Sequence, residues 1–534
     1  MWFATEEFTP DERERLAPYF TNLDGPVFAL VNLPEVVKGA LFARYSRTPK
    51  SLRRLFLDEF AEEVGAAATT GTVGTERAEK LYDRVFFEYG DDSVAQLGGV
   101  HLACEQASQL LCKSLEWGRL AAYLEQSTRY MRYDDRPGGR WRVTVPPEIE
   151  GSGVAEPFRD YVDLSFETYG KLFEPMAEFF RRLYPKDPND SDFVYRSTIT
   201  AKTCDTLRDM LPAATRSNVG IYGTGQAYEQ LLLRLRAHPL REMREYADLM
   251  LTELRKVIPA FLKRVDLPDR GVAWSEYLAE TGDRTRDLAS KLLAGVEPET
   301  RDEVTLVDWD PEGEVKVVAA ALYAASDLPD DQLLEIARAM SPAEREAAFT
   351  AYVGERGNRR HKPGRAFERT QYRFDVLCDY GAFRDLQRHR LLTLEWQRLT
   401  TAHAYEIPPE IEEAGFSDDW RSVMDRSDEI SEALVAEGLD DAAQYAVAMA
   451  YRIRFVMQMN AREAMHVIEL RSTPQGHPVY RRVAQQMHRL IDEQAGHHAI
   501  AAAMGYADHS TVELERLEAE RRTESKRALS DGRG

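Results

Sequence analysis

Cysteine is scarce in this chain, with four among 534 residues. None stands in a Cys-x-x-Cys pair, so neither a disulfide framework nor a thiolate zinc site is expected. Nothing in the sequence marks Cys112 or Cys204 as an activated nucleophile. This cysteine usage suits a reducing compartment, and we expect a cytoplasmic protein.

The chain also lacks long apolar runs and a net positive charge. Charged residues interrupt every hydrophobic run well before the ~20 residues that span a bilayer. The first residues lack the basic and then apolar pattern of a signal peptide. Acidic side chains number 90 against 69 lysines and arginines, a net charge of −21. We therefore expect neither nucleic acid nor a membrane as partner, although local arginines could hold a small anion. No glycine-rich dinucleotide fingerprint or P-loop occurs.

Helical periodicity dominates what is present. Apolar residues recur at helical spacing in 36–46, 50–64, 76–89, 158–184, 225–236, 243–264, 331–339, 442–459 and 480–493. Strand-like runs are short and few, at 27–31, 141–145 and 304–307. The prediction is an α+β, helix-rich fold, and the length is enough for two or more domains.

Three short segments recur in the same order in both halves of the chain. Their positions are 115–120 and 394–399, 145–149 and 407–411, and 235–239 and 470–478. The repeats predict two tandem modules, 1–282 and 303–534. The polar stretch 283–302 between them is typical of a connector. The charged stretch from Leu514 onward predicts a solvated helix that frays into a tail.

Two segments carry residue types that suit an anionic ligand. Arg388-His389-Arg390 places two forked guanidiniums beside an imidazole, a combination that matches phosphate oxygens. Glu125, Ser127 and Arg129 alternate, so an extended backbone would direct all three to one face, toward the base, sugar and phosphate of a nucleotide. Taken alone, each segment is more typical of a solvated turn or strand.

Together the two segments resemble halves of one signature, Arg-His-Arg-x-x-Ser-x-Asn-Glu-x-Ser-x-Arg-Tyr, which marks the flavin-dependent thymidylate synthases. Counting back from Arg129-Tyr130 places residues 117–119, Trp-Gly-Arg, at the Arg-His-Arg positions. Counting forward from Arg388 places Glu395 and Trp396 at the Asn and Glu positions. Module one has thus lost the first half of the signature, and module two has lost the second half. The repeat at 115–120 and 394–399 would shift the alignment of the two modules by eight residues relative to the count along the signature. We prefer the count, because the interval to the family's preceding Glu-His position fits it.

Two further motifs support the resemblance. Residues 460–471 are similar to the family's Asn-x-Arg-x-x-x-(Asn/His)-x-x-x-Leu-Arg, which implies that Asn460 and His466 bind flavin and that Arg471 reaches the nucleotide. Residues 207–212 are similar to Ala-Arg-x-x-Leu-Pro, which implies a nucleotide-binding Arg208; module two has Gln444 there. A family histidine is replaced by Leu97 and by Arg369, with His101 and His361 out of register.

The resemblance implies an enzyme that methylates deoxyuridylate to thymidylate. Its cofactor would be FAD, its carbon donor methylenetetrahydrofolate and its reductant NADPH, with no cysteine nucleophile. It assigns the nucleotide to Glu125, Gln126, Ser127, Arg129, Arg208 and Arg471, with Ser127 and Arg129 as catalytic candidates. It assigns the flavin to Arg388, His389, Arg390, Asn460 and His466. No metal is expected, because the histidine–carboxylate spacings at 488–497 are common on exposed helices.

Two alternatives stay open. The altered positions Glu395 and Trp396 motivate methylation of another pyrimidine nucleotide. The missing histidine and the split motif motivate a non-catalytic flavin- or nucleotide-binding homologue. Family sites form between subunits, so two fused modules could build one site, and a further pairing into a homodimer is expected by analogy.

Overall fold

The computed structural model describes residues 96–511 without interruption, together with 6–25, 28, 30–35, 37, 38, 40, 41, 50–62, 64, 514, 517, 520–522, 524 and 525. Its contacts divide the chain into two compact units. The first comprises 1–107, 118–126 and 218–296, and the second 108–117, 127–217 and 297–534. The units are therefore a different division of the chain from the sequence modules.

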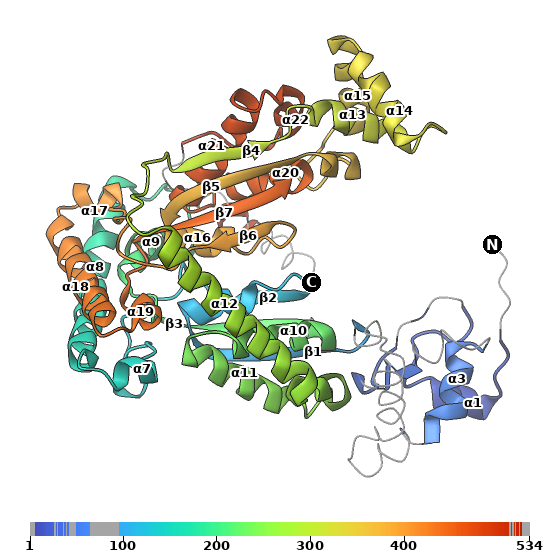
Figure 1. The fold of residues 1–534 in the computed structure, drawn as a ribbon, viewed down its shortest axis with the longest axis horizontal. Coiled ribbons are helices and arrows are strands. Elements are labelled where there is room, and N and C mark those ends of the chain that lie inside the picture. The colour runs from blue at the N-terminus through green and yellow to red at the C-terminus, as the bar shows by residue number, and fades with distance from the viewer. Residues whose placement is uncertain are drawn as a thin grey trace. The chain divides into compact units, whose positions relative to one another are not determined.

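The first unit is built on a three-stranded sheet of order β1-β3-β2 (Figure 1). The strands are β1 (Gly99–Ser108), β2 (Ala121–Glu125) and β3 (Arg216–Thr224), whose ends at Ser108 and at 216–217 are counted in the second unit. β2 and β3 run antiparallel, with Glu125 opposite Val219. Among its described residues, this unit contains the helices α1 (Pro10–Leu16), α3 (Leu52–Glu59), α10 (Gly225–Arg236), α11 (Arg241–Leu254), η4 (Pro259–Asp266), η5 (Pro268–Val272) and α12 (Ala273–Leu292).

The second unit contains a four-stranded sheet of order β4-β5-β7-β6. Its strands, all paired antiparallel, are β4 (Val304–Trp309), β5 (Gln371–Asp379), β6 (Thr393–Trp396) and β7 (Arg452–Asn460). Helices α20 (Ala461–Arg471) and α21 (Pro478–Glu493) pack along it (Figure 1). The remaining elements are α6 (Gln109–Glu116), η2 (Pro137–Gly139), α7 (Pro147–Glu150), α8 (Ala155–Leu183), α9 (Asp192–Leu207), η3 (Arg208–Met210), α13 (Gly313–Tyr323), α14 (Asp330–Ala339), α15 (Pro342–Val353), η6 (Arg365–Arg369), α16 (Tyr380–Leu386), α17 (Pro409–Glu413), α18 (Ser417–Ala436), α19 (Asp440–Ala443), η7 (Gln444–Ala446) and α22 (His498–Ala503).

Most of the expected elements that fall in the described residues are confirmed. Helices occupy 225–236 and 331–339 as expected, α8 and α21 contain nearly all of 158–184 and 480–493, and β4 contains 304–307. Stretch 243–264 is divided between α11 and η4, and 50–64 contains α3. Stretch 76–89 lies outside the described residues, as do parts of 27–31 and 36–46.

Three expectations were wrong. Stretch 442–459 is not one helix: α19 and η7 end at Ala446, and from Arg452 onward it is β7, in which buried Ile453, Phe455 and Met457 alternate with partly exposed residues in the period-two pattern of a strand. Stretch 141–145 forms no strand, and Val143 makes only an isolated bridge with Thr215. The connector 283–302 is helical as far as Leu292, because α12 continues into it.

The two tandem modules are visible in the order of elements. The series β1-α6-β2-α7-α8-α9-η3-β3-α10-α11 recurs as β5-α16-β6-α17-α18-α19-η7-β7-α20-α21. Ser108 and Asp379 cap the first helix of each series, and each side chain accepts a backbone N–H three residues ahead. This equivalence pairs Trp117 with Arg388, as the motif count does. Residues 115–116 end a helix whereas 394–396 form a strand, so that repeat is not structural. The α+β fold with two tandem modules is confirmed.

Equivalent segments of the two modules pair with each other inside the second unit. Pro212 and Ala448, which follow η3 and η7 at equivalent positions, form an antiparallel bridge. The Ala213 amide donates to the Val447 carbonyl at 2.8 Å, and the Met449 amide donates to the Leu211 carbonyl at 2.9 Å. Helices α8 and α18, also equivalent, pack together. Within the second unit, these equivalent segments thus pair as matching segments of two subunits do in a symmetric dimer.

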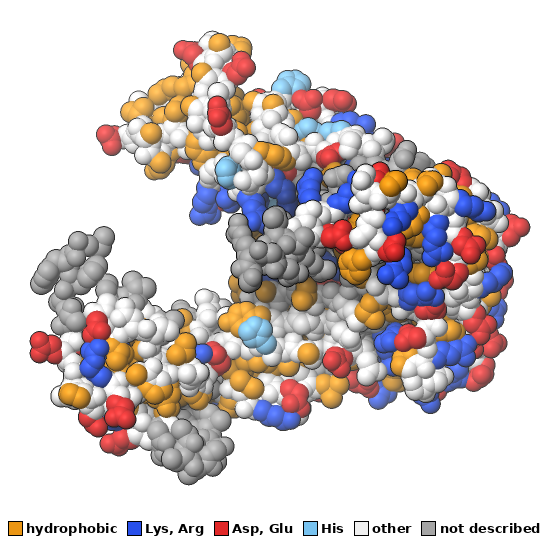
Figure 2. Space-filling view, turned by 180° about the vertical axis from the view of Figure 1, so that it is seen from behind, with side chains coloured by type: hydrophobic (Ala, Val, Ile, Leu, Met, Phe, Trp, Pro, Cys, Tyr) orange, Lys and Arg blue, Asp and Glu red, His pale blue; other side chains and the backbone are white. Residues whose placement is uncertain are grey.

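The surface charges, the state of the cysteines and the polarity of the helices can each be compared with the composition. Figure 2 shows acidic and basic side chains interspersed over the face that it displays. All four cysteines are free and buried. In the described part of the chain, each helix is too short or too polar to cross a bilayer.

Candidate functional site

Arg129 anchors the candidate site to two other elements of the second unit. It stands in the turn after β2, and its guanidinium donates to both carboxylate oxygens of Asp205 on α9, from Nε at 2.7 Å and from Nη2 at 2.6 Å. Its Nη1 donates to the Tyr480 hydroxyl on α21 at 3.0 Å. Burial alone would lower the pKa of Arg129, but Asp205 raises it well above the ordinary value. The pair is therefore fully ionised.

Asp385 lies among guanidiniums that come from both modules. Its carboxylate is 3.8 Å from Arg388 Nη1, 3.8 Å from Arg471 Nη1 and 4.0 Å from Arg208 Nη2. Burial alone would raise the pKa of Asp385. The charges of these three arginines, and of Arg129, instead hold that pKa far below its usual range. We call Arg129, Arg208, Arg388 and Arg471 with Asp385 the arginine cluster.

Arg208 and Arg388 differ in how they meet solvent. Arg208 is 2% exposed, and its Nη2 donates to the Gly381 carbonyl at the start of α16 at 3.3 Å. The Arg388 side chain is 35% exposed. The cluster thus runs from a buried cation to one that solvent and ligands reach. Several cations held close together favour a further anion, with phosphate the natural match for forked guanidinium donors.

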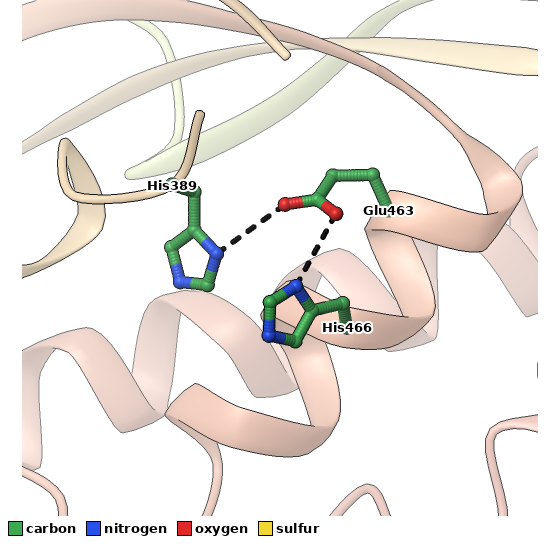
Figure 3. A group of neighbouring side chains, drawn as sticks. All are labelled: His389, Glu463 and His466. Carbon is green, nitrogen blue, oxygen red and sulfur yellow. Dashed lines mark hydrogen bonds and ion pairs between the residues drawn. The ribbon is translucent and has the colours of Figure 1, made fainter. Parts of the chain in front are cut away.

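A line of hydrogen-bonding groups extends from Arg471 along α20. Arg471 Nε donates to His389 Nε2 at 2.9 Å, and His389 Nδ1 lies 3.4 Å from Glu463 Oε1. Glu463 Oε2 lies 3.2 Å from Nδ1 of His466, one turn along the helix (Figure 3). Asn460 starts the helix, because its side-chain oxygen accepts the Glu463 backbone N–H at 2.9 Å.

The pKa values of these groups agree with their contacts. Burial lowers the pKa of His389 to about 4, with Arg471 adding to the effect and Glu463 opposing it. Burial would raise the pKa of Glu463, but hydrogen bonds to His389 and His466 lower it to about 2. At neutral pH, His389 is therefore neutral and Glu463 is charged.

His389, Glu463 and His466 also have ligand atoms within 4.8 Å of one another, close enough for one metal ion. A metal on His389 Nδ1 would require a proton on Nε2, yet Nε2 already faces the Nε–H of Arg471 at 2.9 Å. Arginine only donates hydrogen bonds. The contact with Arg471 thus opposes metal binding on chemical grounds.

Two buried acids lie behind the cluster. Burial raises the pKa of Asp209 to about 6 and that of Asp379 well above its ordinary value, and the nearby Asp209 carboxylate raises the pKa of Asp379 further. A Cβ atom added at Gly381 would lie 2.0 Å from Asp209 Oδ1, so a larger residue there would force the Asp209 side chain to move. Both acids line a cavity of about 340 Å³ with Asp205, Glu406, Trp420 and His477 among its other walls.

The predicted site residues divide between the units. Ser127, Arg129, Arg208, Arg388, His389, Arg390, Asn460, His466 and Arg471 belong to the second unit, and Glu125 and Gln126 belong to the first. Glu125 ends β2 and is buried, while Gln126 Oε1 accepts a hydrogen bond from the Asn218 amide at 3.0 Å. The Ser127 hydroxyl accepts the Arg129 backbone N–H at 3.2 Å. Arg390 is partly exposed, directly after His389.

Four contributors were missed from sequence: Asp205, Asp385, Glu463 and Tyr480. Asp385 stands one helical turn before Arg388, and Glu463 lies inside the motif that begins at Asn460, so spacing could have found both. Asp205 and Tyr480 carried no local signal. Arg369, at one position of the missing family histidine, forms an ion pair with Asp330 at 2.8 Å.

The fold and the arginine cluster define a tandem two-module protein whose basic site draws on both modules. The family model described as thymidylate synthase complementing protein matches residues 41–260 and 305–495, one match in each module. The chain therefore belongs to that family, and its resemblance to the flavin-dependent thymidylate synthases is confirmed.

Three UPF0159 proteins are similar to this chain over most of its length. A UPF0159 protein of Chlamydia muridarum is 38% identical over 523 residues, 97% of this chain and 98% of the relative. A UPF0159 protein of Chlamydia pneumoniae is 38% identical over 526 residues, with the same coverage. A UPF0159 protein of Thermoplasma acidophilum is 30% identical over 511 residues, 90% of this chain and 97% of the relative.

Proposed function

We propose that this protein is a flavin-dependent enzyme that methylates deoxyuridylate to thymidylate. FAD would be its cofactor, methylenetetrahydrofolate its carbon donor and NADPH its reductant. The observation that carries the proposal is the arginine cluster, in which Arg129 and Arg208 of module one and Arg388 and Arg471 of module two surround Asp385. A nucleotide phosphate is an anion of the right charge for such a group.

On the nucleotide side, each residue has a distinct proposed task. Arg129, Arg208 and Arg471 hold the phosphate, and the tight pairing of Arg129 with Asp205 keeps its guanidinium oriented before the ligand arrives. Ser127, beside the backbone of Arg129, orients the sugar or base, with Glu125 and Gln126. This chain's contribution to the reaction is positioning and electrostatic stabilisation.

On the flavin side, the residues suit an anionic cofactor. The side chains of Arg388 and His466 are 35% and 34% exposed, so a ligand can reach their donors. With Arg390 and Asn460 they would hold FAD, and His389 would contact it through its ring while both ring nitrogens face protein groups. Bound and reduced, the flavin supplies the hydride.

A second candidate is methylation of a different pyrimidine nucleotide. Glu395 and Trp396 stand where the family signature has Asn and Glu, and burial raises the pKa of Glu395. The Trp396 ring packs edge-on against Trp117 at 5.5 Å. Because the side chains at these two positions differ from those of the family signature, they favour a pyrimidine base other than uracil. A non-catalytic binding protein is the third candidate, and it would show ligand binding without turnover.

The decisive experiment combines flavin content with turnover. Absorbance of the purified protein should show bound FAD, and deoxyuridylate should be converted to thymidylate. Arg129→Ala and Arg388→Ala should each reduce turnover by at least about 100-fold. Arg132→Ala is the matched control, because Arg132 lies three residues from Arg129 but forms an exposed pair with Asp134. Full activity in either cluster variant would contradict a site shared by both modules.

Substrate choice, location and assembly have their own tests. A nucleotide panel in which another pyrimidine outperforms deoxyuridylate, or failure to rescue a thymidine auxotroph, would favour the second candidate. We also propose a cytoplasmic location, in keeping with four free cysteines. Light scattering of the flavin-loaded protein tests the proposed homodimer, which a monomer would contradict.

A further inference from the structure

His389 is held at both ring nitrogens by residues of a single helix. Arg471 ends α20 and lies against Nε2, while Glu463 stands in its first turn and lies against Nδ1. Positions eight apart in a helix fall on one face, so the two groups bracket the imidazole from the same side of α20. His389 itself comes from the loop after α16. The imidazole therefore links a loop expected to bind flavin with an arginine expected to bind nucleotide.

The contacts of His389 with Arg471 and Glu463 together indicate which of its nitrogens carries the proton. Arginine is protonated throughout the accessible pH range and has no acceptor atom. His389 Nε2, 2.9 Å from Arg471 Nε, must therefore present its lone pair. A neutral imidazole then has its proton on Nδ1, which faces the carboxylate of Glu463.

Glu463 is suited to hold that tautomer. It is buried, 5% exposed, and it uses one carboxylate oxygen for each imidazole, Oε1 toward His389 and Oε2 toward His466. A deprotonated carboxylate such as that of Glu463 accepts hydrogen bonds and donates none. Its charge also lies on the far side of His389 from the Arg471 guanidinium, so it strengthens the imidazole as an acceptor for Arg471.

We propose that Glu463 is a positioning residue that fixes the His389 tautomer and, through His389, aims Arg471 at the phosphate of the nucleotide. This inference rests on the proposed function only for the identity of the ligand. The tautomer and the direction of Arg471 are properties of the protein without ligand. Glu463 touches neither nucleotide nor flavin in this scheme.

The test compares Glu463→Gln with Glu469→Gln. Glutamine keeps the size of Glu463 but removes the charge and can donate to His389 as well as accept. Glu469 is the matched control, because it is a buried glutamate on the same helix that pairs with Arg356 at 2.6 Å and has no contact with His389. Both variants lose a buried carboxylate of α20, so a general loss of stability affects both.

The first measurement is the nitrogen NMR spectrum of histidine-labelled protein without ligand. Wild type and Glu469→Gln should show His389 with a protonated Nδ1 and a bare Nε2, assigned through His389→Gln. Glu463→Gln should show a mixture of the two tautomers. Retention of the wild-type pattern in Glu463→Gln overturns the proposal. A Zn²⁺-induced shift of both His389 and His466 in wild type also overturns it, because a metal would then occupy the place of the Nδ1 proton.

The second measurement is deoxyuridylate binding and turnover in flavin-loaded protein. Glu463→Gln should weaken nucleotide affinity by about tenfold, the value of one charge-assisted hydrogen bond, with KM raised and kcat changed less than twofold. Glu469→Gln should leave affinity unchanged. An equal loss in both variants overturns the proposal. If wild type binds no pyrimidine nucleotide, the proposed function fails, while the NMR result still decides the role of Glu463.

Discussion

Arg129 donates two hydrogen bonds to the carboxylate of Asp205, from Nε at 2.7 Å and from Nη2 at 2.6 Å. The side chains are 12% and 8% exposed, so the pair is close to fully buried. Breaking a buried pair leaves a charge without compensation and costs far more than removing both partners together. This asymmetry separates a structural role of the pair from a role in ligand binding.

Arg129→Ala should lower the free energy of unfolding by about 3–5 kcal/mol, because Asp205 is left buried and unpaired. The double variant Arg129→Met with Asp205→Leu should recover most of that loss while still failing to bind nucleotide. Urea unfolding measures the free energy of unfolding of each variant, and titration calorimetry measures nucleotide binding. Arg132→Ala, which removes surface ion pairs with Asp134 and Glu174 and a cation–π contact with Phe173, should cost only about 1–2 kcal/mol. Equal costs for the two single variants would contradict the buried pair.

Gly381→Ala should destabilise the protein by about 1–3 kcal/mol, because its Cβ would lie 2.0 Å from Asp209 Oδ1. Gly282→Ala is the control, since Gly282 lies in α12 with open space around it, and alanine there should gain about 0.5–1 kcal/mol. Urea unfolding compares the two. Adding Asp209→Ala to Gly381→Ala should restore part of the loss. A neutral Gly381→Ala would mean that α16 and η3 do not approach so closely.

Asp385→Asn should make the protein depend on added anion. Without the carboxylate, the surrounding guanidiniums repel one another, and the free energy of unfolding should fall by about 1–3 kcal/mol in phosphate-free buffer. Inorganic phosphate should raise the melting temperature of the variant more than that of wild type. Asp308→Asn, at a 54% exposed side chain, serves as control. An identical response to phosphate in all three proteins would argue against an anion site at the cluster.

His477 should make the protein sensitive to mild acid. Burial, and secondarily Arg208, lowers the pKa of His477 to about 3, against about 6.5 in an unfolded chain. The unfolded chain therefore binds this proton more readily. The contribution to stability is complete above about pH 6.5 and is lost as pH falls toward 3, by about 1.4 kcal/mol per pH unit.

His477→Gln should therefore show a shallower loss of stability between pH 6.5 and 5 than wild type, measured by urea unfolding at each pH. His389, with its pKa lowered to about 4, has the same sign and leaves a slope in the variant. His498→Gln is a control of the opposite sign: His498 is exposed and Asp492 raises its pKa, so removing it should not make the loss of stability shallower. Identical slopes for His477→Gln and wild type would contradict a buried neutral imidazole.

Motif spacing predicted the correspondence between the modules better than local likeness did. The motifs at 207–212 and 460–471 pair Gln444 with Arg208 and Asn460 with Thr224, and these residues begin equivalent elements. The repeated Leu-Glu-Trp segment misleads, because 115–116 end a helix and 394–396 form a strand. The spacing of the motif residues is kept because their side chains must hold a fixed geometry. Short similarities between apolar segments arise by chance.

The error over 442–459 has a physical cause. Methionine, arginine and glutamine are good helix formers, and they fill β7 at Met457, Arg454 and Gln458. Strand pairing on both sides, with β5 and β6, overrides that preference. A central strand is stabilised by its neighbours, and no window of the chain contains them.

The sequence by itself determined the family, the tandem repeat and the division of the signature, because these depend on residue types at fixed spacing. The partners of the arginines were decided only by tertiary structure. Asp205 reaches Arg129 through packing within module one, whereas Arg208 reaches Gly381 across the modules, which pair through the equivalent segments around Pro212 and Ala448. Contacts between residues far apart in the chain depend on that packing, and local spacing carries no information about it.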